Sequence, residues 1–214
     1  MAQSKESPEA ATVLSPVSVK TPRHGAGNLT GNPRKVKDLA ADFHNYIMKW
    51  EVLNSKGMEI VTKIANIKIE KVYDAQQVGD GEKRVTLPLE LNPLCDSLAE
   101  VIESMAVLES KLSYKAKNAE ALAALEQLHP SSNDDSTLLF NTMTLQDVAV
   151  TTKEIQYDFH KELQLKRVLL SKVAHASSRE ESEVLAACWL HQPYIKPQCY
   201  DLVQALLKET GHVK

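Results

Sequence analysis

The side chains best suited to bind a metal are Cys188, His191 and Cys199, near the C-terminal end of the chain. Zinc is bound by thiolate and imidazole groups, and His175 or His212 could supply a fourth ligand. The C-x2-H-x7-C spacing matches no zinc finger that we recognise, however, and paired C-x-x-C motifs are absent. We therefore favour a structural role, with Cys188 in a core and His191 at a helix end, and keep a zinc-stabilised domain as an alternative.

The sequence carries no motif typical of catalysis. G-x-S-x-G, P-loop, G-x-G-x-x-G and H-E-x-x-H patterns are all absent. Asp and Glu residues are scattered over positions that would form the polar faces of helices, which is typical of solvated charges rather than of an acid–base pair. The sequence therefore predicts a protein that is not an enzyme and that uses no cofactor.

Composition narrows the fold class and the kinds of partner. Of the 214 residues, 43% are hydrophobic and 25% charged, so a core can form, while 5% aromatics and 7 glycines favour helices over a β-rich fold. A net charge of −3 gives no reason to expect direct binding to nucleic acid. The 3 cysteines are typical of a reducing compartment. Without a signal-like segment or 18 consecutive apolar residues, we expect a soluble intracellular protein that binds no membrane.

The element against which the rest of the chain must pack is a long helix predicted at residues 36–72. Apolar residues or glycine recur there in alternating steps of three and four, which forms one continuous stripe on a helix roughly 55 Å long. A second apolar row flanks this stripe, so we expect more than one neighbouring helix. At Gly57 either a partner helix approaches closely or the helix kinks. We predict partner binding at six positions of the stripe: Phe43, Tyr46, Trp50, Leu53, Ile60 and Ile64.

Two further long helices are predicted. The second begins with Asn92 as N-cap and Pro93 at its first position, and ends near Leu128. The third begins at Thr144, in a capping box with Asp147. Its apolar seam shifts after Phe159, which predicts a stutter and an irregular supercoil. The seam residues before the shift are Leu145, Val148, Thr152 and Ile155, and those after it are Leu163, Leu170 and Val173.

Two short helices follow in the C-terminal region. Ser178 and Glu181 have capping-box spacing, and a last helix runs to about Glu209. The first short helix would bury Val184, Leu185, Cys188 and Trp189. Trp189 is either a partner-binding residue, because tryptophan is enriched at interfaces, or part of an intramolecular cap.

The predicted fold is all-α: an elongated antiparallel coiled coil or helical bundle of three long helices. Residues 1–33 form a disordered tail rich in Ser, Thr and Pro. Residues 34–176 form the long-helix region, with loops near 73–91 and 129–143, and the short helices of residues 177–214 cap the bundle. Three candidate phosphorylation sites in the tail each precede a proline: Ser7, Ser15 and Thr21.

Three segments together resemble the cyclin-dependent kinase 2-interacting protein family. They are KVKDLAADFHNYIMKWEVLNSKG with IANIKI (35–57 and 64–69), KELQLKR (161–167), and WLHQPYI with ETGH (189–195 and 209–212). The resemblance implies a non-catalytic adaptor in the nucleus, associated with chromatin, with a further cytoplasmic pool. It offers no catalytic residue to carry over.

The same resemblance implies particular partners. They are a cyclin-dependent kinase, a replication-initiation kinase and a checkpoint kinase partner protein, so that the chain would link cell-cycle and checkpoint signalling to DNA replication. It further implies that the chain is an accessory subunit, beside a second coiled-coil subunit, of an AAA-type ATPase complex. That complex would act on chromatin-bound replication proteins and in maturation of the large ribosomal subunit.

The apolar stripe leaves two simpler possibilities open. The wide helix faces could be completed by a second copy of the chain, which would make a homodimer. Alternatively, the rods could serve as a structural tether that associates with neither a kinase nor an ATPase.

Overall fold

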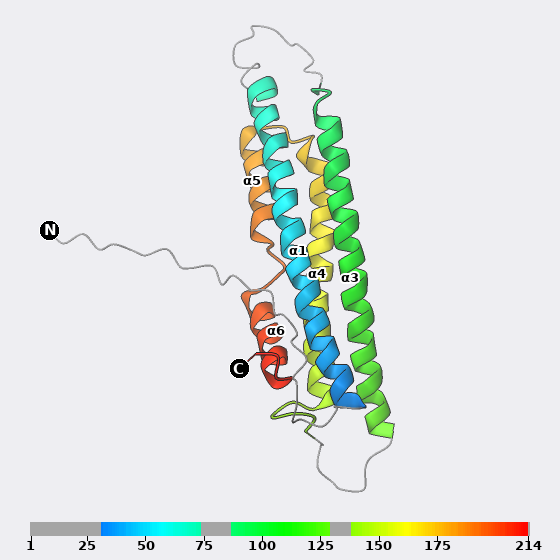
Figure 1. Ribbon diagram of the computed structural model, residues 1–214. Helices are drawn as coiled ribbons and strands as arrows, with labels where there is room; N and C mark the ends of the chain where they lie inside the picture. The colour runs from blue at the N-terminus through cyan, green and yellow to red at the C-terminus, as the bar shows by residue number, and fades with distance from the viewer. Residues whose placement is uncertain (1–30, 74–86, 129–137, 214) are drawn as a thin grey trace, which may run out of the picture.

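The computed structural model describes residues 31–73, 87–128 and 138–213, and every regular element within these ranges is a helix (Figure 1). The predicted all-α class with three long helices is therefore confirmed for the described part of the chain. Residues 1–30 of the predicted tail, with Ser7, Ser15 and Thr21, lie outside it, whereas residues 32–33, also predicted as tail, already belong to the first helix. The helices are α1 (Asn32–Lys68), its π-helical continuation η1 (Ile69–Tyr73), α3 (Leu91–Leu128), α4 (Leu145–Val173), α5 (Arg179–His191) and α6 (Pro197–Glu209).

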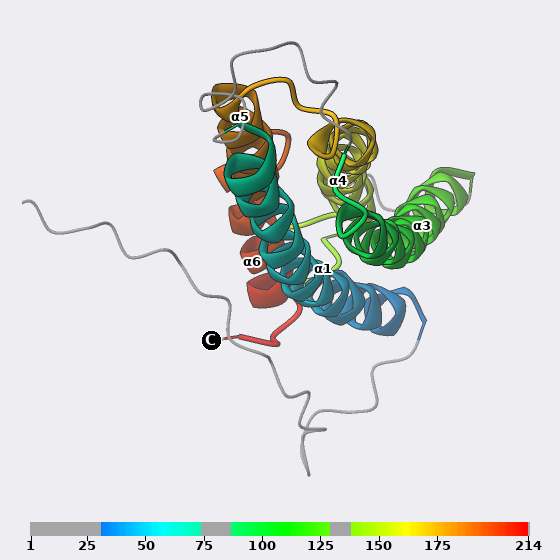
Figure 2. The same ribbon diagram turned by 90° about the horizontal axis from the view of Figure 1, so that it is seen from above.

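The three long helices lie side by side, with α3 antiparallel to α1 and α4 (Figure 1). The short helices α5 and α6 follow one another along α1 and α4, on the side away from α3 (Figures 1 and 2). They thus form a broken fourth side of the bundle and run along it, whereas the sequence had placed them as a cap. This arrangement lets α1 and α4 bury apolar surface on two sides.

Local sequence signals explain where the helices begin and end. Thr144 and Asp147 form the predicted capping box, with the Thr144 hydroxyl accepting from the Asp147 N–H and the Asp147 carboxylate accepting from the Thr144 N–H. Ser178 likewise accepts from the Glu181 N–H, but the Glu181 carboxylate accepts from Ser177 instead. The end of α3 at Leu128 and the end of α6 at Glu209 agree with prediction.

Two local predictions need correction. Helix α3 begins at Leu91 rather than after Asn92, because the N–H groups of these two residues already bond to the carbonyls of Pro88 and Leu89. Val184 is 60% exposed, since the face that α5 turns to the bundle is formed by Leu185 and Trp189.

The predicted register shift in α4 is also wrong. The buried positions after Phe159 continue in the same alternating steps through Glu162, Lys166, Leu169 and Val173. Two charged residues occupy seam positions that the sequence pattern had assigned to apolar side chains. The seam therefore keeps its register and carries a buried ion pair.

Polar contacts tie the two ends of the bundle. At one end the Lys68 ammonium donates to the carbonyl of Ala174 (2.9 Å) and to that of Ala176, at the C-terminus of α4. A cation is favourable there because helix carbonyls concentrate negative potential. At the other end the Glu209 carboxylate accepts from the Thr142 N–H and hydroxyl, at 3.0 and 2.6 Å. None of the described helices is long and apolar enough to cross a membrane.

Candidate partner-binding site

The stripe of α1 that the sequence singled out lies mostly inside the chain's own core. Phe43, Trp50, Ile60 and Ile64 are at most 7% exposed. Tyr46 and Leu53 are half-buried, and Trp189 on α5 is fully buried. Partner binding through this set stays a prediction, and the side chains of the set that present surface to a partner are Tyr46 and Leu53.

Trp50 connects α1 to α4 and to the end of α5. Its indole packs edge-on against the ring of Phe159, with centroids 5.1 Å apart and an interplanar angle of 89°. Its N–H donates to Gln192 Oε1 at 2.7 Å, so the polar edge of the buried ring is satisfied. The central tryptophan thus fixes the position of α5 relative to the long helices.

Trp189 packs against α1 at Gly57. A Cβ built at Gly57 would overlap the six-membered ring of the Trp189 indole. The indole N–H donates to the backbone carbonyl of Asn54, one turn earlier, at 3.0 Å. Of the two expectations for Gly57, the close approach of a neighbouring helix is confirmed, and helix α1 continues through this residue without a break.

Lys166 lies at the centre of this contact, and its charged side chain is fully buried. Its ammonium donates to Asn54 Oδ1 at 2.8 Å and to the Trp189 carbonyl at 2.5 Å. It is 3.3 Å from Glu162 Oε1 and 4.3 Å from the centroid of the Trp189 ring. Burial lowers the pKa of Lys166 to about 8, against the opposing effect of Glu162, and burial likewise raises the pKa of Glu162. The Lys166–Glu162 pair therefore joins α4 to α1 and α5, and removing both charged groups from water opposes this stabilisation.

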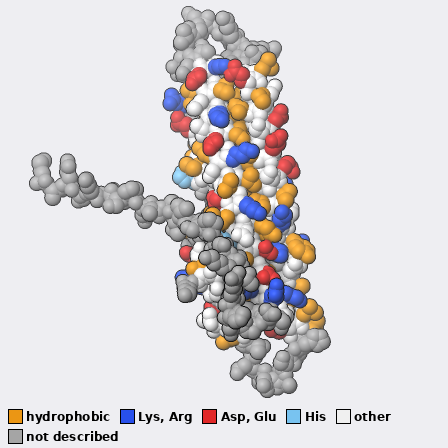
Figure 3. Space-filling model, viewed as in Figure 1, with side chains coloured by type: hydrophobic (Ala, Val, Ile, Leu, Met, Phe, Trp, Pro, Cys, Tyr) orange, Lys and Arg blue, Asp and Glu red, His pale blue; other side chains and the backbone are white. Residues whose placement is uncertain are grey.

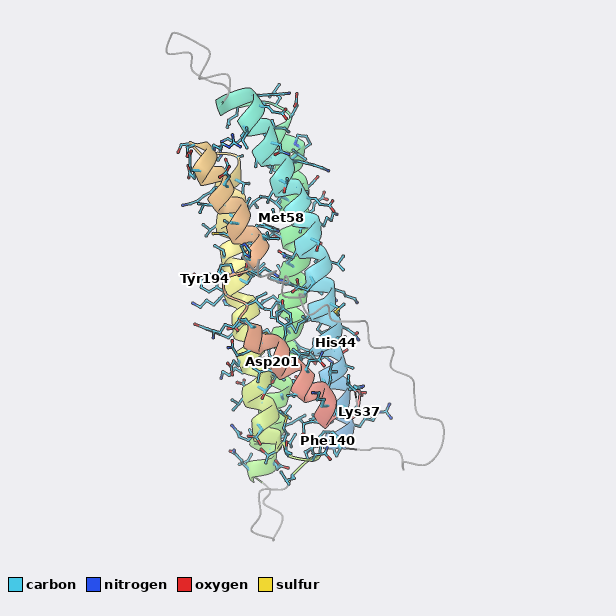
Figure 4. The ribbon with its side chains drawn as sticks, turned by 90° about the vertical axis from the view of Figure 1, so that its left-hand side faces the viewer. Lys37, His44, Met58, Phe140, Tyr194 and Asp201 are labelled. Carbon is cyan, nitrogen blue, oxygen red and sulfur yellow. The ribbon has the colours of Figure 1, made fainter. Side chains whose placement is uncertain are left out.

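The turn between α5 and α6, which Tyr194 marks in Figure 4, completes the same network. Gln192 ends α5 with φ of 45° and ψ of 62°, and its amide donates to Glu51 Oε2 at 3.1 Å. The Tyr200 hydroxyl donates to Glu51 Oε1 at 2.6 Å, and burial together with this carboxylate raises the pKa of Tyr200. The N–H of Tyr194, labelled in Figure 4, donates to Glu162 Oε2 at 3.1 Å. Each helix that meets at the turn contributes a polar partner.

Sequence reasoning missed most of this polar cluster. Glu51, Glu162, Lys166 and Gln192 were not among the predicted site residues. One signal was present: Glu162 and Lys166 continue the seven-residue spacing of α4, so charged residues at seam positions could have been interpreted as a buried pair. For Glu51 and Gln192 the sequence offered no such signal.

The cluster brings together the three segments that carry the family resemblance. Residues 35–57 supply Trp50, Asn54 and Gly57, residues 161–167 supply the ion pair, and residues 189–195 supply Trp189. Segments more than a hundred residues apart in sequence are thus neighbours in space. Their shared role in the structure is to hold α5 and α6 against the long helices.

Tyr46 and Leu53 open onto the outer surface between α1 and α3. Leu53 lines an open hollow of about 710 Å³, and Tyr46 lines a second one of about 560 Å³. Apolar side chains are interspersed with basic and acidic ones over the face formed by these helices (Figure 3). We call this surface the α1–α3 groove; it is lined on α1 by residues 45–53 and on α3 by residues 103–115.

The candidate zinc ligands are differently placed. Cys199 is buried, and burial raises the pKa of its thiol to about 12, whereas His191 is exposed. Within the three described ranges, no group of three or more His, Cys, Asp or Glu side chains could hold a metal ion. A thiol with a raised pKa stays protonated and is a poor ligand at neutral pH.

The sequence is similar to that of known proteins along nearly the whole chain. The chain is 31% identical over 197 residues to a cyclin-dependent kinase 2-interacting protein of Xenopus laevis, covering 90% of this chain and 94% of that protein. It is 30% identical over 194 residues to the protein of the same name in Homo sapiens, covering 86% and 92%. The Mus musculus protein of that name is 29% identical over 206 residues, covering 92% and 96%. No family model matches the sequence.

Proposed function

This chain belongs to the cyclin-dependent kinase 2-interacting protein family, and we propose that it is a non-catalytic adaptor that binds a cyclin-dependent kinase. The observation that carries the proposal is the extent of the similarity, which spans 86–92% of the chain in the relatives named above. A similarity of this length spans most of the chain rather than one segment. The relatives' name gives the kinase as the partner.

The finer parts of the proposal rest on the resemblance of the three sequence segments. We propose nuclear, chromatin-associated work beside a replication-initiation kinase and a checkpoint kinase partner protein, with a cytoplasmic pool. We also propose an accessory role in an AAA-type ATPase complex that acts on replication proteins and on the maturing large ribosomal subunit. In that complex the ATPase activity would belong to the partners.

Two structural features support an adaptor: the aromatic side chains are buried inside the bundle, and an apolar groove lies on its surface. The large aromatic residues of the stripe hold the bundle together, and the bundle leaves an apolar groove with charged edges on its outside. Such a rigid scaffold presents a surface without a flexible segment having to fold first, which lowers the entropic cost of binding. A kinase would bind on the outside of α1 and α3.

The test is direct binding between the purified full-length chain and cyclin-dependent kinase 2, with and without its cyclin, followed by biolayer interferometry. We expect saturable binding with a Kd in the micromolar range or tighter, and no hydrolysis of ATP by the purified chain on its own. As matched controls, the chain should not bind an unrelated kinase or the free cyclin with equal affinity.

The outcomes separate the adaptor from a structural tether. A tether would bind neither form of the kinase and would co-purify with no ATPase subunit. Failure to bind both the free and the cyclin-bound kinase would contradict the proposal. Recovery of an AAA-type ATPase with the endogenous chain, in proportion to its amount, would support the accessory role.

A further inference from the structure

Four residues in one row along α1 differ in exposure: the two at the ends are buried and the two in the middle are partly exposed. Leu39, Tyr46, Leu53 and Ile60 are spaced by seven residues and therefore lie on the same side of the helix. Leu39 and Ile60 are 3% and 7% exposed, whereas Tyr46 and Leu53 are only half-buried. The chain therefore covers the two outer residues of this row but leaves the two middle ones, Tyr46 and Leu53, partly exposed.

Several of the α3 side chains that line the two hollows are small. Lys111 lies over the ring of Tyr46, with 5.8 Å from Nζ to the centroid, which places the middle of α3 opposite the middle of α1. At this level α3 contributes Ser104, Ala106 and Ser110 to the two hollows. These side chains are short, whereas the Lys111 side chain reaches over the ring of Tyr46, and the two hollows stay shallow and open to solvent.

The groove is apolar at its centre and on its borders. Val52, Val107 and Tyr114 are 68%, 54% and 64% exposed, and they line the hollows that Leu53 and Tyr46 open onto. The α3 residues of the groove, 103–115, span roughly 18 Å at about 1.5 Å per residue. This is the size of about three turns of a helix, and a grooved apolar surface between two helices is the shape that an amphipathic helix fits.

The charges around the groove are biased toward lysine. Lys115 is paired with Asp42 at 2.5 Å. Lys49 and Lys111 also line the hollows, and among the described residues neither takes part in a salt bridge. Asp42 lies outside the lining of the two hollows, and Glu103 is the one carboxylate among the residues that line them. Two lysines without a carboxylate partner, set on both helices, would attract acidic residues on the flank of a bound segment.

We propose that the α1–α3 groove binds an amphipathic helix of a partner protein, apolar on one face and acidic along the flank that meets Lys49 and Lys111. The inference deepens the proposed adaptor function and rests on it for the existence of a partner. The contacts that the chain leaves open, Tyr46 and Leu53, become buried against the apolar face. The acidic flank orients the bound helix in the groove and makes its association rate depend on salt concentration.

The probe is a synthetic helical peptide of fourteen residues, with Leu at the buried heptad positions and Glu on both flanks, labelled for fluorescence anisotropy. A second peptide replaces each flanking Glu with Lys and keeps the Leu positions. We expect the full-length chain to bind the Glu peptide at least about tenfold more tightly than the Lys peptide at low salt, and to lose most of this preference in 0.5 M NaCl. Equal affinity for both peptides, or no binding, would overturn the proposal.

Two variants show whether the groove is the site. Ser104→Trp fills the groove from α3, and Ser171→Trp is its matched control, because both serines are exposed and donate to a carbonyl of their own helix. We expect Ser104→Trp to lose peptide binding and Ser171→Trp to keep it, at equal melting temperature. In case Ser104→Trp is less stable, the double charge reversal Lys49→Glu/Lys111→Glu should instead transfer the preference to the Lys peptide. Retention of wild-type preference in both groove variants would contradict the proposal.

Parallel measurements separate this inference from the adaptor function. If the wild-type and Ser104→Trp chains capture the kinase equally and neither binds the Glu peptide, the adaptor stands and the groove inference is wrong. If the peptide binds as expected and the kinase does not, the groove stands and the kinase assignment is wrong. Sedimentation showing a dimer that Ser104→Trp dissociates would assign the groove to a second copy of the chain and overturn the proposal.

Discussion

At the scale of single residues, Gly57 is where a missing side chain decides the packing. The Trp189 indole occupies the space that a Cβ would fill. We expect Gly57→Ala to lower the free energy of unfolding by about 1–3 kcal/mol, as overpacking does. Urea denaturation measures this. Helix propensity alone would favour alanine by about 1 kcal/mol, so a variant as stable as the wild type or more so would contradict the close contact. In a Trp189→Leu background the loss should shrink.

Lys166 and Glu162 give a second test at this scale. Because removing one partner leaves the other charge buried, we expect Lys166→Met to cost about 3–5 kcal/mol of stability. Adding Glu162→Gln removes the orphaned charge and keeps an acceptor for the Tyr194 N–H, so the double variant should recover part of that loss. Denaturant unfolding of the wild type, the two single variants and the double variant provides the double-mutant cycle. Strictly additive single effects would show that the two side chains do not interact.

The buried thiol of Cys199 predicts a dependence of stability on pH. Its pKa is raised from 9.0 to about 12 by burial, so the folded chain holds this proton more tightly than the unfolded chain. The resulting stability is complete below pH 9 and is lost as pH rises toward 12. Between pH 8 and pH 10 the wild type should lose about 1 kcal/mol more than Cys199→Ala. Urea unfolding at both pH values checks this, and equal losses in the two chains would contradict it.

At the scale of elements, helix ends follow local rules. The hydroxyl of Thr144 satisfies the Asp147 N–H at the start of α4, and hydrogen bonds to Thr144 lower the pKa of Asp147. We expect Thr144→Ala to cost about 1 kcal/mol. Thr62→Ala is the control, because the Thr62 hydroxyl is exposed and donates within α1 to the Met58 carbonyl. Thermal unfolding compares the two, and an equal loss in both would argue against the cap.

The seam of α4 shows where an element cannot be understood alone. The pattern of apolar residues in the sequence predicts a register shift near Leu163, because Glu162 and Lys166 are charged. In the bundle both are buried, since each finds polar partners on other helices: Asn54, the Trp189 carbonyl and the Tyr194 N–H. Those partners lie 23 to 112 residues from Lys166 or Glu162 in sequence. No local pattern could show that the partners would be there.

At the scale of the whole molecule, α5 and α6 serve as the fourth side of the bundle. A chain that ends at residue 176 would expose Trp50 and leave Lys166 without the Trp189 carbonyl. We expect this chain to lose cooperative unfolding and to bind an apolar dye such as ANS. Circular dichroism and dye fluorescence measure both effects. A separate peptide of residues 177–214 should restore the cooperative transition, and a truncated chain as cooperative as the full one would contradict this role.

The sequence by itself determined the helices, most of their ends and the stripe of α1 that must be buried, because these depend on periodicity and on caps formed within a few residues. The tertiary structure alone decided what covers the stripe. Trp50 and Trp189 serve the chain's own core, because α5 and α6 return alongside α1 and supply Gln192 and the indole at Gly57. It also decided that Tyr46 and Leu53 are only half-buried and line open hollows between α1 and α3. Contacts between distant segments are fixed by how helices pack, and that information is not local in the chain.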